Sequence, residues 1–161
     1  MARRTLSFDN LDAAVADARH LMVAGYTRAG NWSLGQVCGH LALWVRYPLD
    51  GFPHMSVPVR AVLWGLRNSI GKAKKVEYLA GIMPAGKPTL PMTVPPADAD
   101  DVAGVTEYEA AVERLKKLTD TPHPSPLLGP VTRDELERLT CVHAAHHLSF
   151  LIPPDAAPGP A

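Results

Sequence analysis

Apolar residues recur at helical spacing in the first third of the chain and predict two helices. From about Asn10 to Ala24 they share one helical face, and Gly25 follows as a stop signal. A second helix should begin after Ser33. Ser33 and Gln36 have the spacing of a capping box, in which each side chain binds a backbone N–H group of the other residue. Pro48 should kink or end this helix, because proline lacks the N–H donor that a helix interior uses.

The middle of the chain predicts a third helix, a long loop and a further helix. Apolar residues are dense from about Pro58 to Ser69, where the proline suits a first helical turn. The segment from Gly81 to Gly104 is rich in proline and glycine and predicts a loop that wraps the helices, because long irregular segments in compact domains are often functional covers or inserts. Thr106 and Glu109 then have capping-box spacing, so the next helix is expected to start there.

The last predicted helix follows a stiff connector. Thr121 to Pro130 is dense in proline, and Thr132 and Glu135 have the spacing of another capping box. The helix should continue to about Leu151. Two prolines come next, so residues 153–161 are expected to form a flexible tail.

These elements predict a single all-α domain over residues 1–161. Four main helices and little strand-type alternation favour an up-and-down four-helix bundle, in which each helix buries one apolar face. The proline- and glycine-rich segment is then a long loop outside that bundle. A chain of 161 residues is large enough to enclose one hydrophobic core.

Charge and hydropathy exclude several classes of partner. Lysine and arginine balance aspartate and glutamate at 16 each, so no overall field attracts nucleic acid or an anionic membrane. No apolar run approaches the ~20 residues of a membrane-spanning helix. The main basic cluster is interpreted as the solvated face of a helix and its exit loop. Its members are Arg60, Arg67, Lys72, Lys74 and Lys75.

The N-terminal segment and the cysteines predict a cytoplasmic protein. Basic residues at the start are followed by no apolar stretch, so no signal peptide is expected. Cys38 and Cys141 are too few for a disulfide framework, which favours a reducing compartment. Each lies two positions before a candidate metal ligand and should point away from it, as a buried small side chain rather than a reactive thiol.

Histidines are concentrated on the last predicted helix. His143 projects along its apolar stripe, and His146 and His147 flank the stripe on opposite sides. Two histidines four residues apart can bind one ion, which favours the pair His143 and His147. His40, at the edge of an apolar face on the second helix, is the best third ligand. Three protein ligands leave a position for water, as in catalytic zinc sites.

The alternative is that these imidazoles bind no ion and are held by ordinary hydrogen bonds. Burial of an imidazole without a partner costs roughly 1 to 3 kcal/mol, whereas coordination satisfies a lone pair on each ring. Two histidines along one stripe therefore favour the metal, and the hydrogen-bonded alternative stays open.

Several motifs resemble the DinB-like, or YfiT-like, superfamily of metalloenzymes, and in particular a bacterial branch of it. They are Trp32-Ser-Leu-Gly-Gln36, Gly39-His-Leu-Ala42, His123-Pro124, Gly129-Pro130 with Thr132, and His143-Ala-Ala-His-His-Leu148. The resemblance extends from the first helix to Leu151. It implies a four-helix bundle with one divalent metal on three histidines, and those ligands match His40, His143 and His147.

The resemblance also implies a reaction class. Zinc is the first expectation for imidazole ligands, with nickel or iron as alternatives. The expected activity is that of a hydrolase or a thiol-type transferase acting on small molecules. The chain departs from the branch at Leu127-Leu128, where the branch has a more aromatic connector, and at Ala144-Ala145, which supplies no acidic residue between the paired histidines.

A non-catalytic protein is the competing class. In that case the ion only clamps the helices, or a helical face forms a homodimer. A fourth protein ligand would favour the clamp, whereas a pocket beside the ion would favour an enzyme.

Other side chains are weaker candidates for the site. His146 is either a pocket residue or a helix-surface residue, and Gln36 could orient His40 although its capping role already explains it. Asp50 and His54 follow the second helix, where a solvated turn is the simpler interpretation. Trp44 and Trp64 are interpreted as core residues.

Overall fold

The structure, a computed structural model, is mostly helical and describes residues 3–86, 89 and 91–156. Its α-helices are Leu11–Ala24 (α1), Leu34–Asp50 (α2), Val57–Leu66 (α3), Lys72–Leu79 (α4), Asp101–Lys116 (α5) and Arg133–Leu148 (α6). A π-helical segment, Arg67–Gly71, joins α3 to α4, and a short 3-10 helix spans Pro91–Thr93. In the described part of the chain, none of the helices has the length and apolar character needed to cross a membrane.

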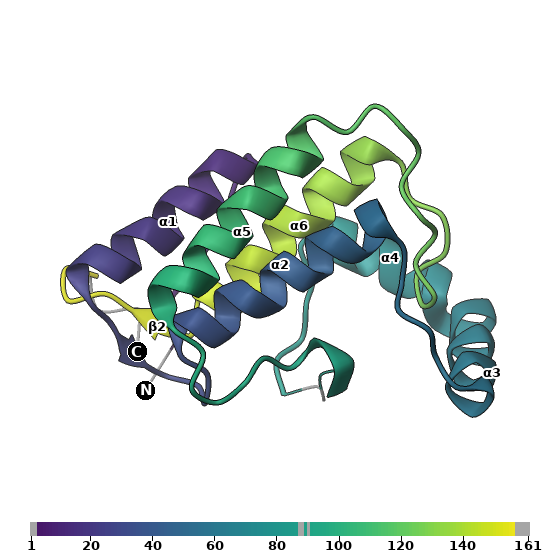
Figure 1. Cartoon of the computed structure of the whole chain (residues 1–161), viewed down its shortest axis with the longest axis horizontal. Helices are drawn as coiled ribbons and strands as arrows, with labels where there is room; N and C mark the ends of the chain where they lie inside the picture. The colour runs from purple at the N-terminus through teal and green to yellow at the C-terminus, as the bar shows by residue number, and fades with distance from the viewer. Residues whose placement is uncertain (1–2, 87–88, 90, 157–161) are drawn as a thin grey trace.

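Helices α1, α2, α5 and α6 lie side by side and enclose the hydrophobic core (Figure 1). Each of α5 and α6 packs against both α1 and α2. Leu21, Leu41, Tyr108 and Leu139, one from each helix, are almost fully buried among them. Burial of such a side chain contributes about 1.5 to 3 kcal/mol, so this core holds the helices that carry the site.

Capping interactions define the starts of α2 and α6, as the sequence predicts. The Ser33 hydroxyl accepts a hydrogen bond from the Gln36 backbone N–H at 3.2 Å, and the Gln36 side chain accepts one from the Ser33 N–H at 3.1 Å. Thr132 and Glu135 form the same reciprocal pair at the start of α6. Both helices that bear the candidate ligands therefore begin at positions specified by local sequence.

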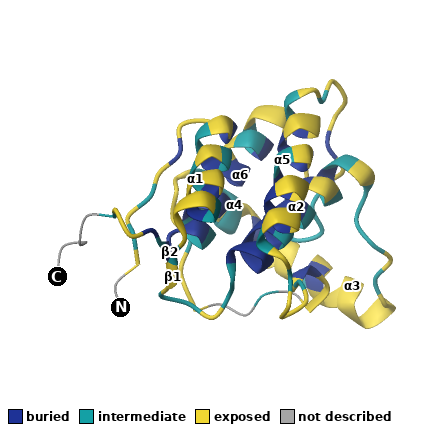
Figure 2. Ribbon diagram, turned by 60° about the vertical axis from the view of Figure 1, so that its left-hand side comes forward, coloured by how far each residue is buried: buried dark blue, intermediate teal, exposed yellow. Residues whose placement is uncertain are grey.

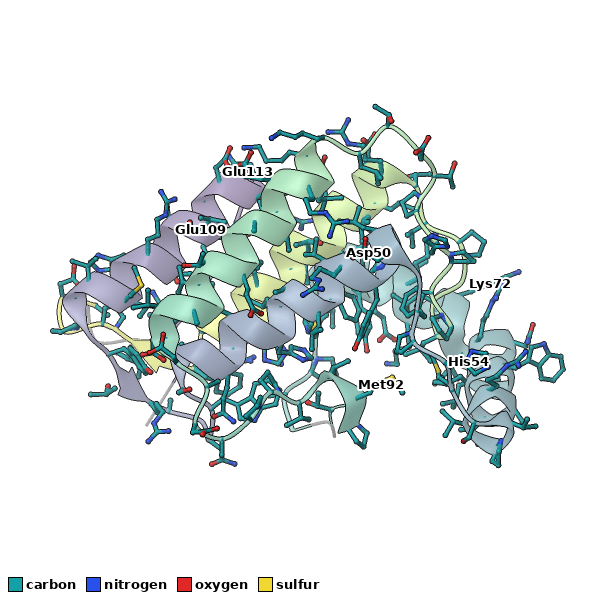
Figure 3. All side chains as sticks on the ribbon, in the orientation of Figure 1. Asp50, His54, Lys72, Met92, Glu109 and Glu113 are labelled. Atoms are coloured by element: carbon teal, nitrogen blue, oxygen red, sulfur yellow. The ribbon has the colours of Figure 1, made fainter. Side chains whose placement is uncertain are left out.

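The predicted start of α5 at Thr106 is wrong. The helix begins five residues earlier, because the Asp100 side chain caps it by accepting a backbone hydrogen bond at 2.8 Å. The Thr106 hydroxyl instead donates to the Val102 carbonyl within the helix at 2.8 Å. The Glu109 side chain, labelled in Figure 3, pairs with Arg19 of α1 at 2.9 Å rather than with the helix start. The long loop accordingly ends before residue 104.

Gly104 is a contact residue of α5 rather than a loop glycine. A Cβ atom at Gly104 would lie 2.6 Å from the carbonyl oxygen of Gly35 on α2, well inside van der Waals distance. The Gly35 N–H donates to Asp101 at 2.7 Å in the same region. The two helices thus meet backbone to backbone, which only residues without a side chain allow.

Of the two predicted effects of Pro48, an end of α2 at this residue is wrong, whereas a kink stays a prediction. The helix continues to Asp50, and Gly51 follows with φ 98°. The proline is buried, and its carbonyl accepts a hydrogen bond from the His123 N–H at 2.8 Å. Tertiary contacts of this kind stabilise the last turn despite the missing donor.

The third predicted helix is longer than its sequence signals indicate. Helical structure continues from α3 through the π-helical segment into α4, which the sequence analysis did not predict. Helix α4 packs on α6, where Lys75 pairs with Glu135 at 2.7 Å. Helix α3 projects away from the four packed helices, and its surface is mostly exposed (Figures 1 and 2). Trp64 is 69% exposed, so its prediction as a core residue is wrong.

The chain after α6 forms a strand that the sequence did not predict. Helix α6 ends at Leu148, and Leu151–Ile152 (β2) pairs antiparallel with Thr27–Arg28 (β1). Of the predicted flexible tail, Pro153 is buried, and residues 157–161 lie outside the described residues.

The close contact between α2 and α5 predicts that alanine lowers stability at Gly104 but not at Gly65. Gly104→Ala should lower the free energy of unfolding by about 1 to 3 kcal/mol, because the new methyl group forces the helices apart. Gly65→Ala in α3, where no atom lies within 4 Å of the new Cβ, should leave stability unchanged or raise it by up to about 1 kcal/mol. Urea denaturation followed by circular dichroism measures both values, and equal effects would contradict the close contact.

Candidate metal centre

Three histidines from two helices converge between α2 and α6. His40 comes from α2, and His143 and His147 lie one turn apart on α6. One ring nitrogen of each lies within 4.8 Å of the other two, and the ring centroids are 4.6 to 4.9 Å apart. The structure therefore brings together the three residues that the sequence predicts.

Burial makes these three rings neutral. It lowers the pKa of His40 from its ordinary value and lowers that of His143 further, with the neighbouring histidines adding to the effect. It lowers the pKa of His147 to about 2. Each ring therefore has one unprotonated nitrogen at neutral pH, as a metal ligand must.

The backbone carbonyl of Thr93 orients the His40 ring. His40 Nδ1 lies 2.7 Å from this oxygen, which can only accept a hydrogen bond, so Nδ1 carries the proton. The lone pair of His40 is consequently on Nε2, which faces His143. Histidines that bind metals commonly donate their second nitrogen to such a carbonyl. Sequence analysis missed Thr93; the only signal was its position in a loop expected to cover the bundle.

His40 and His143 are already spaced like two ligands of one ion. Their Nε2 atoms are 3.2 Å apart, and because His40 Nε2 is unprotonated, His143 donates the hydrogen bond between them. Two nitrogens at ~2.0 to 2.1 Å from a tetrahedral zinc ion would be roughly 3.3 Å apart. His143 Nδ1 is buried with no hydrogen-bond partner among the described residues. Binding of one ion by both Nε2 atoms would need little movement of this pair, but the His143 proton would have to move from Nε2 to Nδ1. His147 would need to approach more closely.

Aromatic side chains surround the three rings. Trp32 stacks on His147, with 5.5 Å between the centroids and planes 8° apart. The Trp44 ring lies 4.3 Å from that of His143, so this tryptophan, predicted to be in the core, belongs to the site. His146 is half-buried and its ring contacts His147 edge-on at 4.9 Å, which makes it a pocket residue. The cluster is therefore bordered by aromatic rings from both α2 and α6 and from the segment before α2.

The histidines form part of the wall of a chamber of about 240 Å³. Its other walls come from α2, α4, the proline-rich connector and the loop that carries Met92, which lies beside α2 (Figure 3). Apolar and aromatic side chains dominate, among them Trp44, Tyr78, Met92, Leu127, Leu128 and Leu139. None of the described residues that line the chamber is acidic. A small molecule with an apolar body fits this space better than a charged one.

The weaker candidates lie elsewhere. Asp50 is exposed at the end of α2 and pairs with Arg114 at 3.0 Å, and His54 is exposed and lines a different cavity (Figure 3). Cys38 and Cys141 are buried, and burial raises the pKa of both thiols, that of Cys141 to about 11. Both match the prediction of unreactive, buried side chains.

The arrangement is that of an open site. Among the described residues, the group that could hold an ion has three members and no fourth cysteine, histidine or carboxylate. Closed structural zinc sites use four protein ligands, whereas catalytic sites use three and leave a position for water or substrate. The three histidines themselves line the apolar chamber.

The lowered histidine pKa values predict that the metal-free protein loses stability in acid. Because the rings stay neutral when folded and titrate near pH 6.5 when unfolded, the unfolded state binds more protons below that pH. The free energy of unfolding should therefore fall as pH drops from about 6.5, by up to ~1.4 kcal/mol per pH unit for each ring. Urea denaturation of chelator-treated protein at several pH values measures this slope. His147→Gln should reduce it, and a flat profile for the unchanged protein would argue against neutral buried rings.

Comparison with known proteins gives a family assignment. No curated protein and no solved structure matches the chain. Residues 1–154 match the family model described as "Protein of unknown function (DUF1569)". This match covers helices α1 to α6 and all three converging histidines. The chain therefore belongs to the DUF1569 family.

Proposed function

We propose that this protein is a metal-dependent enzyme that acts on small molecules, with His40, His143 and His147 as the ligands of one divalent ion. One observation carries the proposal: three neutral imidazoles from α2 and α6 converge at the wall of an apolar chamber. Buried rings of this kind are costly without partners, and an ion would satisfy a lone pair on each. The adjacent chamber supplies room for a substrate, which a purely structural clamp does not need.

Zinc is the proposed metal, with nickel or iron as alternatives. Imidazole ligands suit all three, and zinc most readily accepts a tetrahedral site with three protein ligands. When bound, such an ion polarises a carbonyl or phosphoryl oxygen, or activates a water or thiol as a nucleophile. A hydrolase or a thiol-type transferase is therefore the proposed reaction class.

The chain's own residues have roles consistent with such chemistry. Thr93 holds the His40 ring in one tautomer, and Trp32 and Trp44 restrict movement of the other two ligand rings. The apolar chamber walls would bind the body of the substrate and exclude bulk water.

We also propose that the four packed helices form an up-and-down bundle of the DinB-like type. The pairwise packing of α1, α2, α5 and α6 supports this, as does the placement of one histidine on α2 and two, four residues apart, on α6. In the DinB-like superfamily the three metal ligands have the same distribution over the second and last helices.

A cytoplasmic location is proposed as well, with a small-molecule substrate and neither nucleic acid nor membrane as partner. The formal net charge is zero, and both cysteines are free and buried. These features suit a reducing compartment and give no general attraction to polyanions.

Metal analysis tests the proposed function. The purified protein should contain about one equivalent of zinc, nickel or iron per chain by elemental analysis, and His143→Ala should lose most of it. His54→Ala is the matched control, because it removes an exposed histidine outside the chamber. Added zinc should also raise the thermal midpoint of the metal-free protein but not that of His143→Ala, since an ion that binds only the folded state stabilises it. Equal and negligible metal in all three proteins, with no stabilisation by zinc, would end the proposal.

A dimerising bundle without catalytic activity is the second candidate. Its support is the apolar surface of α3, where Val57, Val62 and Trp64 are 61 to 75% exposed. Large exposed apolar patches commonly mark protein interfaces. If α3 forms a homodimer, light scattering should give twice the chain mass, and Trp64→Glu should reduce it to the chain mass. A monomeric wild-type protein would exclude this candidate.

A further inference from the structure

A second cavity, of about 210 Å³, lies beside the three-histidine centre and has a different character. Its walls come from the segment before α1, the segment after α4, and α6. The lining includes Arg3, Arg4, Thr5, Ser7, Arg138 and His146. His146 and Met83 line both this cavity and the apolar chamber, so they form a shared wall.

Two arginines give this cavity a positive charge that no described carboxylate neutralises. Arg3 and Arg138 form no ion pair among the described residues, and none of the described lining residues is acidic. Both residues are exposed, and each guanidinium group has one contact with the rest of the protein. Arg138 Nε donates to the Leu79 carbonyl at 3.3 Å, and the Arg3 guanidinium lies 5.3 Å over the Phe150 ring.

The third arginine of this cavity, Arg4, contributes neither an unpaired charge nor an accessible Nε donor. Arg4 forms a two-pronged pair with Asp17, at 2.8 and 2.7 Å, which neutralises it. Its Nε atom is buried and has no hydrogen-bond partner among the described residues. Because this nitrogen has almost no exposed surface, it does not offer a donor to a group bound in the cavity. The hydroxyls of Thr5 and Ser7 line the same space and can donate.

We propose that this cavity binds an oxyanion, a carboxylate or phosphate group, and that the group belongs to the substrate of the neighbouring metal centre. The first part stands on the arginines and the cavity alone, whereas the second rests on the proposed function. Guanidinium groups bind carboxylates and phosphates through paired, charge-assisted hydrogen bonds, so the residue type matches the ligand.

Short contacts connect the cavity to the metal centre. The His147 ring contacts His146 at 4.9 Å, His146 contacts Phe150 at 5.7 Å, and Phe150 lies beneath the Arg3 guanidinium. The two sites are therefore neighbours, separated by the side chains of His146 and Met83. A small molecule with its reacting group near the three histidines and its anionic group among the arginines would have to displace one of these two side chains. The substrate class that fits is a small molecule with an apolar body and one anionic end.

Anion binding to the metal-free protein tests the first part of the proposal. At low ionic strength, inorganic phosphate and acetate should each bind at one saturable site in calorimetric or NMR titrations, while neutral acetamide should not bind. Arg138→Gln and Arg3→Gln should each weaken binding by about tenfold, because each removes a charge-assisted hydrogen bond. Arg60→Gln, which removes the same charge from α3 outside this cavity, is the matched control and should bind like the wild type. No saturable binding, or the same loss in all three variants, would overturn the proposal.

The His143→Ala variant separates this proposal from the proposed function. It should lose metal but keep phosphate binding, since His143 does not line the basic cavity. If the wild type binds phosphate but no metal, the anion site stands and the enzyme proposal fails. If it binds metal but neither anion, the oxyanion site fails and the metal centre is unaffected.

The link to the substrate has its own measurement. In zinc-loaded protein, a carboxylate that carries a thiol, such as 3-mercaptopropionate, should bind at least tenfold more tightly than its amide, and Arg138→Gln should abolish the difference. If the amide binds the zinc-loaded wild type as tightly as the carboxylate does, the anion site does not bind the substrate of the metal centre.

Discussion

The burial of three neutral imidazoles between α2 and α6 is the constraint on which the rest of the structure depends. Each ring brings polar nitrogens into an apolar interior, and each needs a partner there. Thr93 supplies one for His40, and His40 and His143 share another across the helix interface. His143 still has one buried nitrogen without a partner among the described residues. The three polar rings are thus surrounded by an otherwise hydrophobic core, as is common at functional sites.

The packing around this cluster explains how the three rings come to lie close together. Helix α2 is held against α5 at Gly35 and Gly104, where the backbones touch, and its first residue is defined by a capping box. Helix α6 begins at the equivalent box formed by Thr132. Since a helix rotates each side chain by a constant angle, two well-defined starts determine where His40 and His143 point. The site therefore depends on contacts far from the imidazoles.

His146 stands at the boundary between two environments. Among the described residues, the chamber on one side has no carboxylate in its lining, and the cavity on the other side has two arginines without an ion pair. Neither cavity alone defines a substrate. Together they are the basis for the proposed substrate class, a small molecule with an apolar body and one anionic end.

Local signals in the sequence were enough to determine the mostly helical character, the starts of α2 and α6 and the ligand pair His143 and His147, because caps and residues one helical turn apart depend on nearest neighbours. His40 was assigned as the third ligand by its helix face and by the family resemblance. Sequence reasoning erred at α5, where Gly104 looked like a loop glycine although its small size serves a contact with α2. It also missed α4 and the pairing of β1 with β2, whose stability comes from partners distant in the chain. Only the tertiary structure placed the Thr93 carbonyl against His40 and gathered Arg3 and Arg138 around one cavity, since such contacts join segments with no local pattern in common.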